Sequence, residues 1–268
     1  MADPVLISDP GDPRVAEYVG LTDAARRRLG AGTFMLESEL VVRRAMAAGV
    51  ALRSVLVTPP RLATLADDLI DLDPDVPVYL ADQAVMSAVA GFDVHRGVLA
   101  SADRPAASTV TDVVAGHDRI AVVEGLTDTE NLGAVFRNAA ALGVGAVVLD
   151  PACTDPLYRR TVRVSMGYVL ATPWARADAW PDALHDIRSA GFRLLALTPQ
   201  GAEPLDDVAA RPGERLAIML GAEGPGLSEA ALAAADQRVA IPMAEGVDSL
   251  NAATAAAIAF HHLRPPRG

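Results

Sequence analysis

The sequence predicts an α/β protein with a small α/β domain at residues 1–104 and a larger parallel-sheet domain at residues 117–268. The chain has 268 residues, of which 51% are hydrophobic, enough for one large core or two ordinary ones. From Arg119 onward, short apolar runs alternate with amphipathic stretches, as in parallel strands covered by helices on both faces. A small, polar, proline-containing stretch at residues 101–109 indicates a linker, which we extend to about residue 116.

Each element of the first domain is expected from its periodicity and its flanking residues. The expected helices cover residues 23–29, 37–48 and 82–90. The expected strands cover residues 52–57, 76–80 and 97–101. Thr22 and Asp82 are the expected N-caps, Gly49 ends the second helix, and Pro59 and Pro60 stop the first strand.

The second domain follows a regular alternation of strands and helices. Its expected strands cover residues 120–123, 146–149, 169–174, 192–197, 216–220 and 238–241. Its expected helices cover residues 130–142, 156–164, 180–190, 228–235 and 250–262. Gly143 and Gly191 are placed to end two of these helices.

Composition excludes several classes of chemistry. All 23 basic side chains are arginines, so the chain has no Walker A loop, no Schiff-base lysine and no lysine-activated serine. Cys153 is the single cysteine, which excludes a disulfide framework and multi-cysteine metal sites. The five histidines show no ligand spacing, so no metal is expected.

The charge balance argues against nucleic-acid binding by bulk electrostatics. The net charge is −11 and the sequence pI is about 4.8, whereas domains that bind nucleic acid through their overall field are basic. Any RNA contact must therefore come from local arginine clusters. No apolar stretch approaches the ~20 residues of a membrane span and no secretory signal is visible, so we expect a cytoplasmic protein without membrane contact.

Loops at the carboxyl ends of the predicted strands are the expected ligand site, because open α/β sheets bind ligands there. These loops hold most of the glycine, asparagine, serine and acidic residues of the second domain. They cover residues 124–131, 150–155, 198–204, 221–226 and 242–249.

The first of these loops opens a helix that carries Asn131 and Arg137. Backbone amides at a helix N-terminus attract anions such as phosphate, so this segment can face a ligand. The two residues are six positions apart, so they converge only if Asn131 lies in the cap region. An ordinary capped helix with a solvated Arg137 explains the same spacing.

Residues 221–228 directly follow a predicted strand and include three glycines and a proline. They permit a sharp turn and a close approach of the backbone to a ligand. The spacing is not that of a dinucleotide-binding loop, and turn chemistry does not explain Glu223. A tight turn without a ligand is the alternative.

The third segment begins at Ile241 and leads into the last helix. Ser249 is expected to cap that helix, with Asn251 at its second or third position. A capped, alanine-rich helix without a functional role is the alternative. Each segment alone is only weakly diagnostic of a function. The occurrence of all three in a fixed order is more diagnostic.

Together the three segments resemble the SpoU/TrmH family of RNA 2′-O-ribose methyltransferases, within the knotted SPOUT class. The family patterns N-x-G-x-x-x-R-x-A, G-x-E-x-x-G-L and I-P-M…S-L-N are matched by Asn131, Gly133, Arg137 and Ala139, by Gly221, Glu223, Gly226 and Leu227, and by Ile241–Met243 and Ser249–Asn251. The match spans the whole second domain. The first domain looks like the small substrate-binding domain of many members, and His95-Arg96-Gly97 is similar to the family's H-Q-G segment.

The resemblance implies transfer of a methyl group from S-adenosylmethionine to a ribose 2′-hydroxyl. Arg137 is then the central catalytic residue, expected first as a clamp for phosphate or an oxyanion, because a general-base arginine needs an unusual pKa. Asn131, Ser249 and Asn251 are implied to position the ribose, the phosphate and Arg137, and Glu223 to organise the site. The cofactor is expected against backbone at Thr198, Gly221, Ile241, Met243 and Leu250.

The resemblance also implies a deep trefoil knot near the end of the chain and a homodimer whose RNA site is formed across two subunits. The sequence departs from the family pattern at Arg96, Thr129 and residues 252–254. These departures weaken an assignment of sub-family and RNA target, but not of the reaction. We expect ribosomal RNA rather than transfer RNA as the substrate, because the chain has two domains and an acidic net charge. Housekeeping and antibiotic-resistance enzymes of this architecture are not separated by sequence.

Two other classes compete with this interpretation. A catalytically silent RNA-binding or ribosome-assembly module would use the same fold, but it has no need of the intact set Asn131, Arg137, Glu223, Ser249 and Asn251. A nucleotide-binding enzyme of ordinary Rossmann type lacks the glycine fingerprint after its first strand.

Two arginine clusters are the local basic groups available for RNA, and solvated helix faces are the alternative for both. They are Arg26, Arg27 and Arg28, and Arg159, Arg160 and Arg163. If they contact phosphate, arginine-to-glutamate changes will weaken RNA affinity and leave cofactor affinity unchanged. Titration of RNA and cofactor against each variant tests this, and unchanged RNA affinity would contradict it.

Overall fold

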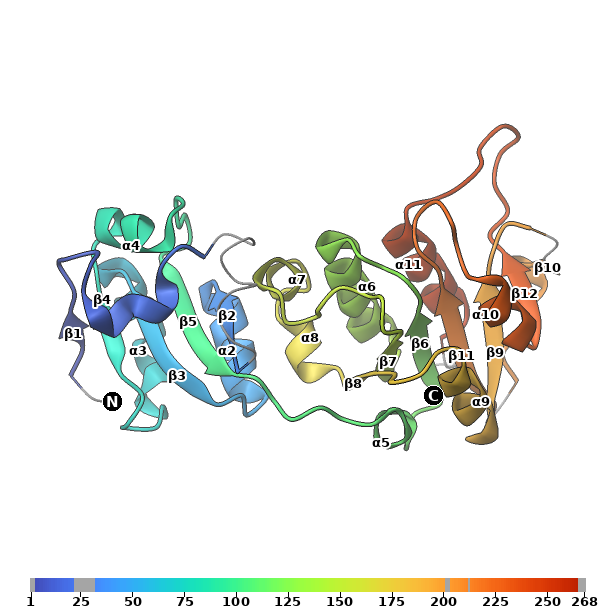
Figure 1. Ribbon diagram of the computed structural model, residues 1–268, viewed down its shortest axis with the longest axis horizontal. Coiled ribbons are helices and arrows are strands. Elements are labelled where there is room, and N and C mark those ends of the chain that lie inside the picture. The colour runs from blue at the N-terminus through green and yellow to red at the C-terminus, as the bar shows by residue number, and fades with distance from the viewer. Residues whose placement is uncertain (1–2, 22–31, 201–202, 212, 265–268) are drawn as a thin grey trace. The chain divides into compact units, whose positions relative to one another are not determined.

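The computed structural model describes residues 3–21, 32–200, 203–211 and 213–264. The chain divides into two compact units, each with its own sheet (Figure 1). The first unit is Met1–Pro105 together with Leu157–Ala171, and the second is Ala106–Pro156 together with Thr172–Gly268. Residues 157–171 thus group with the first unit, whereas the sequence places them within the domain at 117–268.

The first unit is built on a five-stranded mixed sheet. In sheet order its strands are β1 (Val5–Leu6), β4 (Val78–Leu80), β3 (Leu52–Val57), β5 (Val98–Asp103) and β2 (Thr33–Glu37). β1, β4 and β3 are parallel, while β5 runs antiparallel to both β3 and β2. Apolar side chains from this sheet, among them Leu99, pack with Tyr18 and Met86 in a core of their own.

The helices of the first unit confirm part of the expected pattern. They are η1 (Pro13–Tyr18), α2 (Glu39–Ala47), α3 (Pro59–Ile70), α4 (Gln83–Ala90), α7 (Arg159–Val164) and α8 (Tyr168–Ala171). The side chain of Asp82 accepts from the Val85 amide and caps α4, as expected. The helix expected at residues 23–29 lies outside the described residues.

The structure adds one helix that was not expected and corrects one expected strand. Pro59 and Pro60 not only end β3 but also begin α3, because proline fits the first turn of a helix. The strand expected at 169–174 is helical over Tyr168–Ala171, and only β8 (Trp174–Arg176) is extended. The apolar run of Val169 and Leu170 was too short for periodicity to separate helix from strand.

The second unit is built on a seven-stranded sheet in which all pairings are parallel. In sheet order the strands are β10 (Glu203–Pro204), β12 (Gln237–Ala240), β9 (Phe192–Leu197), β11 (Arg215–Leu220), β6 (Arg119–Val123), β7 (Ala146–Leu149) and β8. The parallel α/β architecture expected for this part of the chain is confirmed. Apart from Arg215 at the start of β11, the residues of β6, β7 and β11 are buried, which accounts for the apolar runs of these strands.

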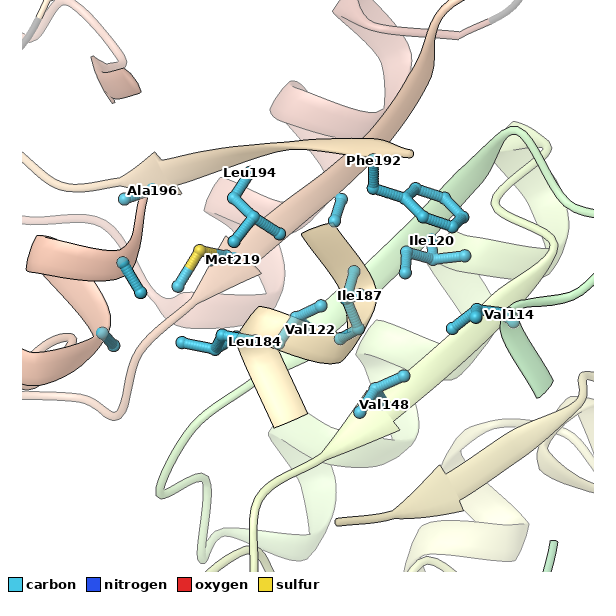
Figure 2. Close-up of a cluster of buried hydrophobic side chains, with 14 of the residues drawn as sticks. Val114, Ile120, Val122, Val148, Leu184, Ile187, Phe192, Leu194, Ala196 and Met219 are labelled. Atoms are coloured by element: carbon cyan, nitrogen blue, oxygen red, sulfur yellow. The ribbon is translucent and has the colours of Figure 1, made fainter. Parts of the chain in front are cut away.

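Helices cover both faces of this sheet. They are α5 (Val110–Val114), α6 (Thr129–Leu142), α9 (Asp182–Ser189), η2 (Leu205–Asp207), α10 (Glu229–Ala234) and α11 (Ala252–His262). α5, α9 and α10 enclose one core, in which Ile120 and Met219 of the sheet meet Leu184 and Ile187 of α9 (Figure 2). α6 and α11 pack against each other and against β7 and β11. No helix of the described residues has the length and apolarity to cross a bilayer.

Leu184 offers a test of the core of the second unit. Its side chain is fully buried, so Leu184→Ala is expected to lower the free energy of unfolding by about 2–5 kcal/mol through lost burial and a residual cavity. The neighbouring exposed residue of α9 gives the control, His185→Ala, with an expected change within about 0.5 kcal/mol. Urea denaturation measures both, and equal effects would contradict the packing of α9.

Candidate active site

The carboxyl ends of three adjacent parallel strands bring together three residues predicted to bind a cofactor. Thr198 follows β9, Gly221 follows β11 and Ile241 follows β12, and β9 lies between the other two strands. The Thr198 amide donates to the Val239 carbonyl at 2.9 Å, which extends the sheet into the loop. Backbone groups of three loops therefore face one edge of the sheet.

Gly221 begins a loop that is tightly closed on itself. A Cβ at this position would lie 2.2 Å from the carbonyl carbon of Gly226 and 2.3 Å from the nitrogen of Leu227, so no other residue fits. Ala222 and Gly226 form an antiparallel bridge, and Gly226 has a φ of 71°, in the left-handed region that favours glycine. The sharp turn expected from the glycines is confirmed.

Asn251 joins all three sequence segments through its side-chain amide. Its Nδ2 donates to Oδ1 of Asn131 at 2.8 Å and to Oε1 of Glu223 at 2.8 Å. Its Oδ1 accepts from the amides of Ala253 at 3.0 Å and Thr254 at 3.2 Å. Every hydrogen-bonding position of the carboxamide is thereby used.

The last helix begins differently from the prediction. Asn251 rather than Ser249 is the N-cap of α11, because its oxygen accepts the first free amides of the helix. Ser249 is exposed in the segment between β12 and α11, which projects beyond the sheet as a long loop (Figure 1). Met243 and Leu250 belong to the same loop, and Leu250 is 37% exposed.

The start of α6 is closed to an external anion. Oδ1 of Asp128 accepts the amides of Glu130 and Asn131, both at 2.8 Å, so a carboxylate already occupies the position that a phosphate would take. The prediction of an anion site at these amides is wrong. Asp128 instead fixes the first turn of the helix, from which Asn131 reaches Asn251.

Arg137 stands apart from this cluster. It lies two turns further along α6, is exposed, and donates to no other residue in the described parts of the chain. Asn131 is the third residue of α6 and not outside it, so the two side chains point in different directions around the helix. The structure therefore brings Asn131, Glu223 and Asn251 together, and leaves Arg137 and Ser249 open to solvent.

Asn138 is a further residue beside the candidate site that the sequence analysis missed. Its Nδ2 donates to the carbonyl of Ala253 at 2.8 Å, which ties α6 to the first turn of α11. The signal was the spacing of seven residues from Asn131, which places both amides on one face of a helix.

Cys153 lies buried in the loop after β7, an environment that disfavours the nucleophilic thiolate. Burial raises the pKa of its thiol to about 12, so the reactive thiolate is absent at neutral pH. The surrounding loop is ordered by Arg176, whose guanidinium donates to the carbonyls of Asp150, Cys153 and Thr154. Among the described residues no cluster of three or more histidine, cysteine or acidic side chains is placed to hold a metal.

Two of the arginines predicted to contact RNA, Arg159 and Arg163, pair with an acidic side chain of the first unit. Arg159 pairs with Glu37 and lies 4.3 Å from the centre of the Phe92 ring, and its side chain is 13% exposed. Arg163 also pairs with Glu37, at 3.3 Å, but is 40% exposed. Arg26, Arg27 and Arg28 lie outside the described residues.

The two roles of Asn251 can be separated by substitution. Asn251→Ala removes the cap and is expected to cost about 1 kcal/mol of unfolding free energy or more. Asn251→Asp keeps an oxygen for the helix amides, so α11 retains its cap, but it removes both donors and places a carboxylate beside Glu223. We therefore expect the change in unfolding free energy caused by Glu223→Gln to be more favourable in the Asn251→Asp protein than in the wild type. Urea denaturation of the four proteins measures this coupling, and additive effects would contradict the contact.

Comparison with known proteins identifies the family of this chain. The model of the SpoU rRNA Methylase family matches residues 118–261. The chain is 47% identical over 271 residues to an uncharacterized tRNA/rRNA methyltransferase of Mycobacterium tuberculosis, covering 97% of this chain and 93% of the relative. It is 27% identical to the 23S rRNA (adenosine(1067)-2′-O)-methyltransferase of Streptomyces azureus, covering 95% and 94%. An AdoMet-bound rRNA methyltransferase of Sinorhizobium meliloti aligns with a TM-score of 0.81 at 25% identity, covering 96% of both chains. The expected family is thus confirmed: the chain belongs to the SpoU rRNA methylase family.

Proposed function

We propose that this protein transfers the methyl group of S-adenosylmethionine to a ribose 2′-hydroxyl in RNA, with ribosomal RNA as the substrate class. The contact of Asn251 with Asn131 and Glu223 carries the proposal, because it unites all three family segments beside the carboxyl edge of the parallel sheet. Relatives named as 23S rRNA 2′-O-methyltransferases support the ribosomal target. A transfer-RNA target is the alternative, since the mycobacterial relative is named for both RNA classes.

The residues at the sheet edge fit S-adenosylmethionine. Thr198, Gly221 and Ile241 present backbone donors and acceptors, and the absence of a side chain at Gly221 lets a ligand approach the main chain. Met243 and Leu250 supply apolar surface from the projecting loop. When bound, the cofactor supplies an electrophilic methyl group. The AdoMet-bound relative supports this assignment.

Methyl transfer requires the ribose oxygen to be oriented and to lose its proton as it gains the methyl group. Arg137 is permanently charged and has no partner among the described residues, so its guanidinium is available to bind a phosphate or the developing oxyanion. Asn251 has no hydrogen-bonding capacity left for substrate and acts as a positioning residue. Glu223 uses Oε1 for Asn251, while Ser249 is exposed and free to contact the substrate.

We also infer that the protein acts as a homodimer, with Arg137 completing the site of the partner protomer. The direction of Arg137 around α6, away from Asn131, supports this arrangement. The first unit is proposed to bind the RNA, with Arg26, Arg27, Arg28, Arg160 and Arg163 as candidate phosphate contacts. A deep knot at the end of the chain remains a prediction.

The decisive test is transfer of labelled methyl from S-adenosylmethionine to total RNA separated by size. Wild type is expected to label one RNA class, and Arg137→Ala to lose about 100-fold or more in rate while keeping cofactor affinity. Arg238→Ala, on an exposed position of β12, is the matched control and is expected to retain activity.

The outcomes separate the competing functions. Label in ribosomal RNA supports the proposal, and label in small RNA supports the transfer-RNA alternative. Cofactor binding without any label means that the assay lacks the right RNA or assembly context, so the labelling is then repeated on ribosomal subunits and their precursors. Absence of both label and cofactor binding would favour the catalytically silent module.

A further inference from the structure

Glu124 lies directly after β6 and is engaged at both ends of the loop that begins at Gly221. Its backbone amide donates to the Leu220 carbonyl at 2.9 Å, immediately before the loop. Its carboxylate accepts from the Ser228 amide at 2.8 Å and from the Ser228 hydroxyl at 2.6 Å, immediately after the loop. One residue therefore holds both the entrance and the exit of residues 221–227.

The carboxylate is buried, with the residue 7% exposed. Its third donor is the indole N–H of Trp180, at 2.6 Å. Within the described residues no arginine or histidine pairs with it, so three neutral donors alone compensate the charge. Burying a carboxylate without a cation is costly, so all three donors stabilise it, and the two bonds from Ser228 fix the geometry of that residue.

The loop transmits this geometry to the candidate active site. Because Gly221 touches Gly226 and Leu227 and Ala222 bridges to Gly226, the loop has little freedom to absorb a shift at Ser228. Gly221 stands at the proposed cofactor edge, and Glu223 accepts from Asn251. A displacement of Ser228 therefore moves both the cofactor edge and the Asn251 contact.

We propose that Glu124 is a positioning residue that sets cofactor affinity by clamping residues 221–227, an inference that rests on the proposed methyl transfer. Glu124→Gln keeps the size of the side chain, and its oxygen can still accept from Trp180 and from the Ser228 hydroxyl, but its amide nitrogen then meets the Ser228 amide and that bond is lost. Supporting hydrogen bonds of this kind determine how accurately a binding loop is held. We expect about tenfold weaker binding of S-adenosylmethionine.

Two controls separate positioning from general stability. Trp180→Phe removes a bond to Glu124 but leaves both Ser228 bonds, so cofactor affinity should stay close to wild type. Asp236→Asn alters another carboxylate that accepts a backbone amide, that of Leu194 at 2.8 Å. Asp236 lies just before β12, away from the carboxyl edge of the sheet. Its substitution should leave cofactor affinity unchanged.

Calorimetry with S-adenosylmethionine and hydrogen exchange of the full-length ligand-free protein test the proposal together. Glu124→Gln is expected to bind the cofactor about tenfold more weakly and to exchange the amides of residues 222–228 faster, while Asp236→Asn does neither. Wild-type affinity in Glu124→Gln, or equal loss of affinity in Trp180→Phe, would overturn the inference.

The exchange measurement also distinguishes this inference from the proposed function. If the wild type binds no S-adenosylmethionine, the proposed function fails, and exchange alone then decides on Glu124. Unchanged exchange of residues 222–228 in Glu124→Gln would overturn the clamp. Faster exchange confined to that loop would support Glu124 as its positioning residue, whichever ligand the loop binds.

Discussion

The side-chain amide of Asn251 is the contact on which the candidate active site depends. It donates to Asn131 and Glu223 and accepts from two amides at the start of α11, which uses all the capacity of a carboxamide. Three segments that are distant in sequence are therefore held by one small group. A shift of α6, of the loop after β11 or of α11 must alter at least one of these bonds. The positions of the three segments are therefore coupled.

The parallel sheet makes this contact possible. β9, β11 and β6 are adjacent and buried, and the loops that follow them leave the sheet at one edge. Tight packing beneath these loops resists small displacements, so the polar contacts above are presented in a fixed arrangement. Glu124 links the sheet to the polar contacts above it, because its amide continues the sheet while its carboxylate accepts a hydrogen bond from Ser228.

Much of this arrangement was predictable from local sequence. Residues 146–149 are predicted with the observed bounds because strands buried on both faces are continuous apolar runs between turn residues, and residues 192–197 follow the same pattern with Arg193 as the one interruption. β2 was missed because the chain passes from strand to helix at Ser38, whose φ of 93° no local pattern signals. The partners of Asn251 were also not predictable, since they lie 28 and 120 positions away and only the folded chain brings them together.

The acidic balance of the protein limits how it can hold RNA. With a net charge of −11, long-range attraction is unavailable, and Arg159 is already committed to a buried Glu37 and to the Phe92 ring. The Glu37 side chain is only 6% exposed. If Arg159 left it to bind RNA, the buried carboxylate would lose part of its compensating charge, which is energetically unfavourable. We therefore expect few phosphate contacts and RNA recognition that depends on shape, stacking and contacts to the 2′-hydroxyl. That limit suits an enzyme that identifies one nucleotide by its folded surroundings and whose reaction takes place at the 2′-hydroxyl itself.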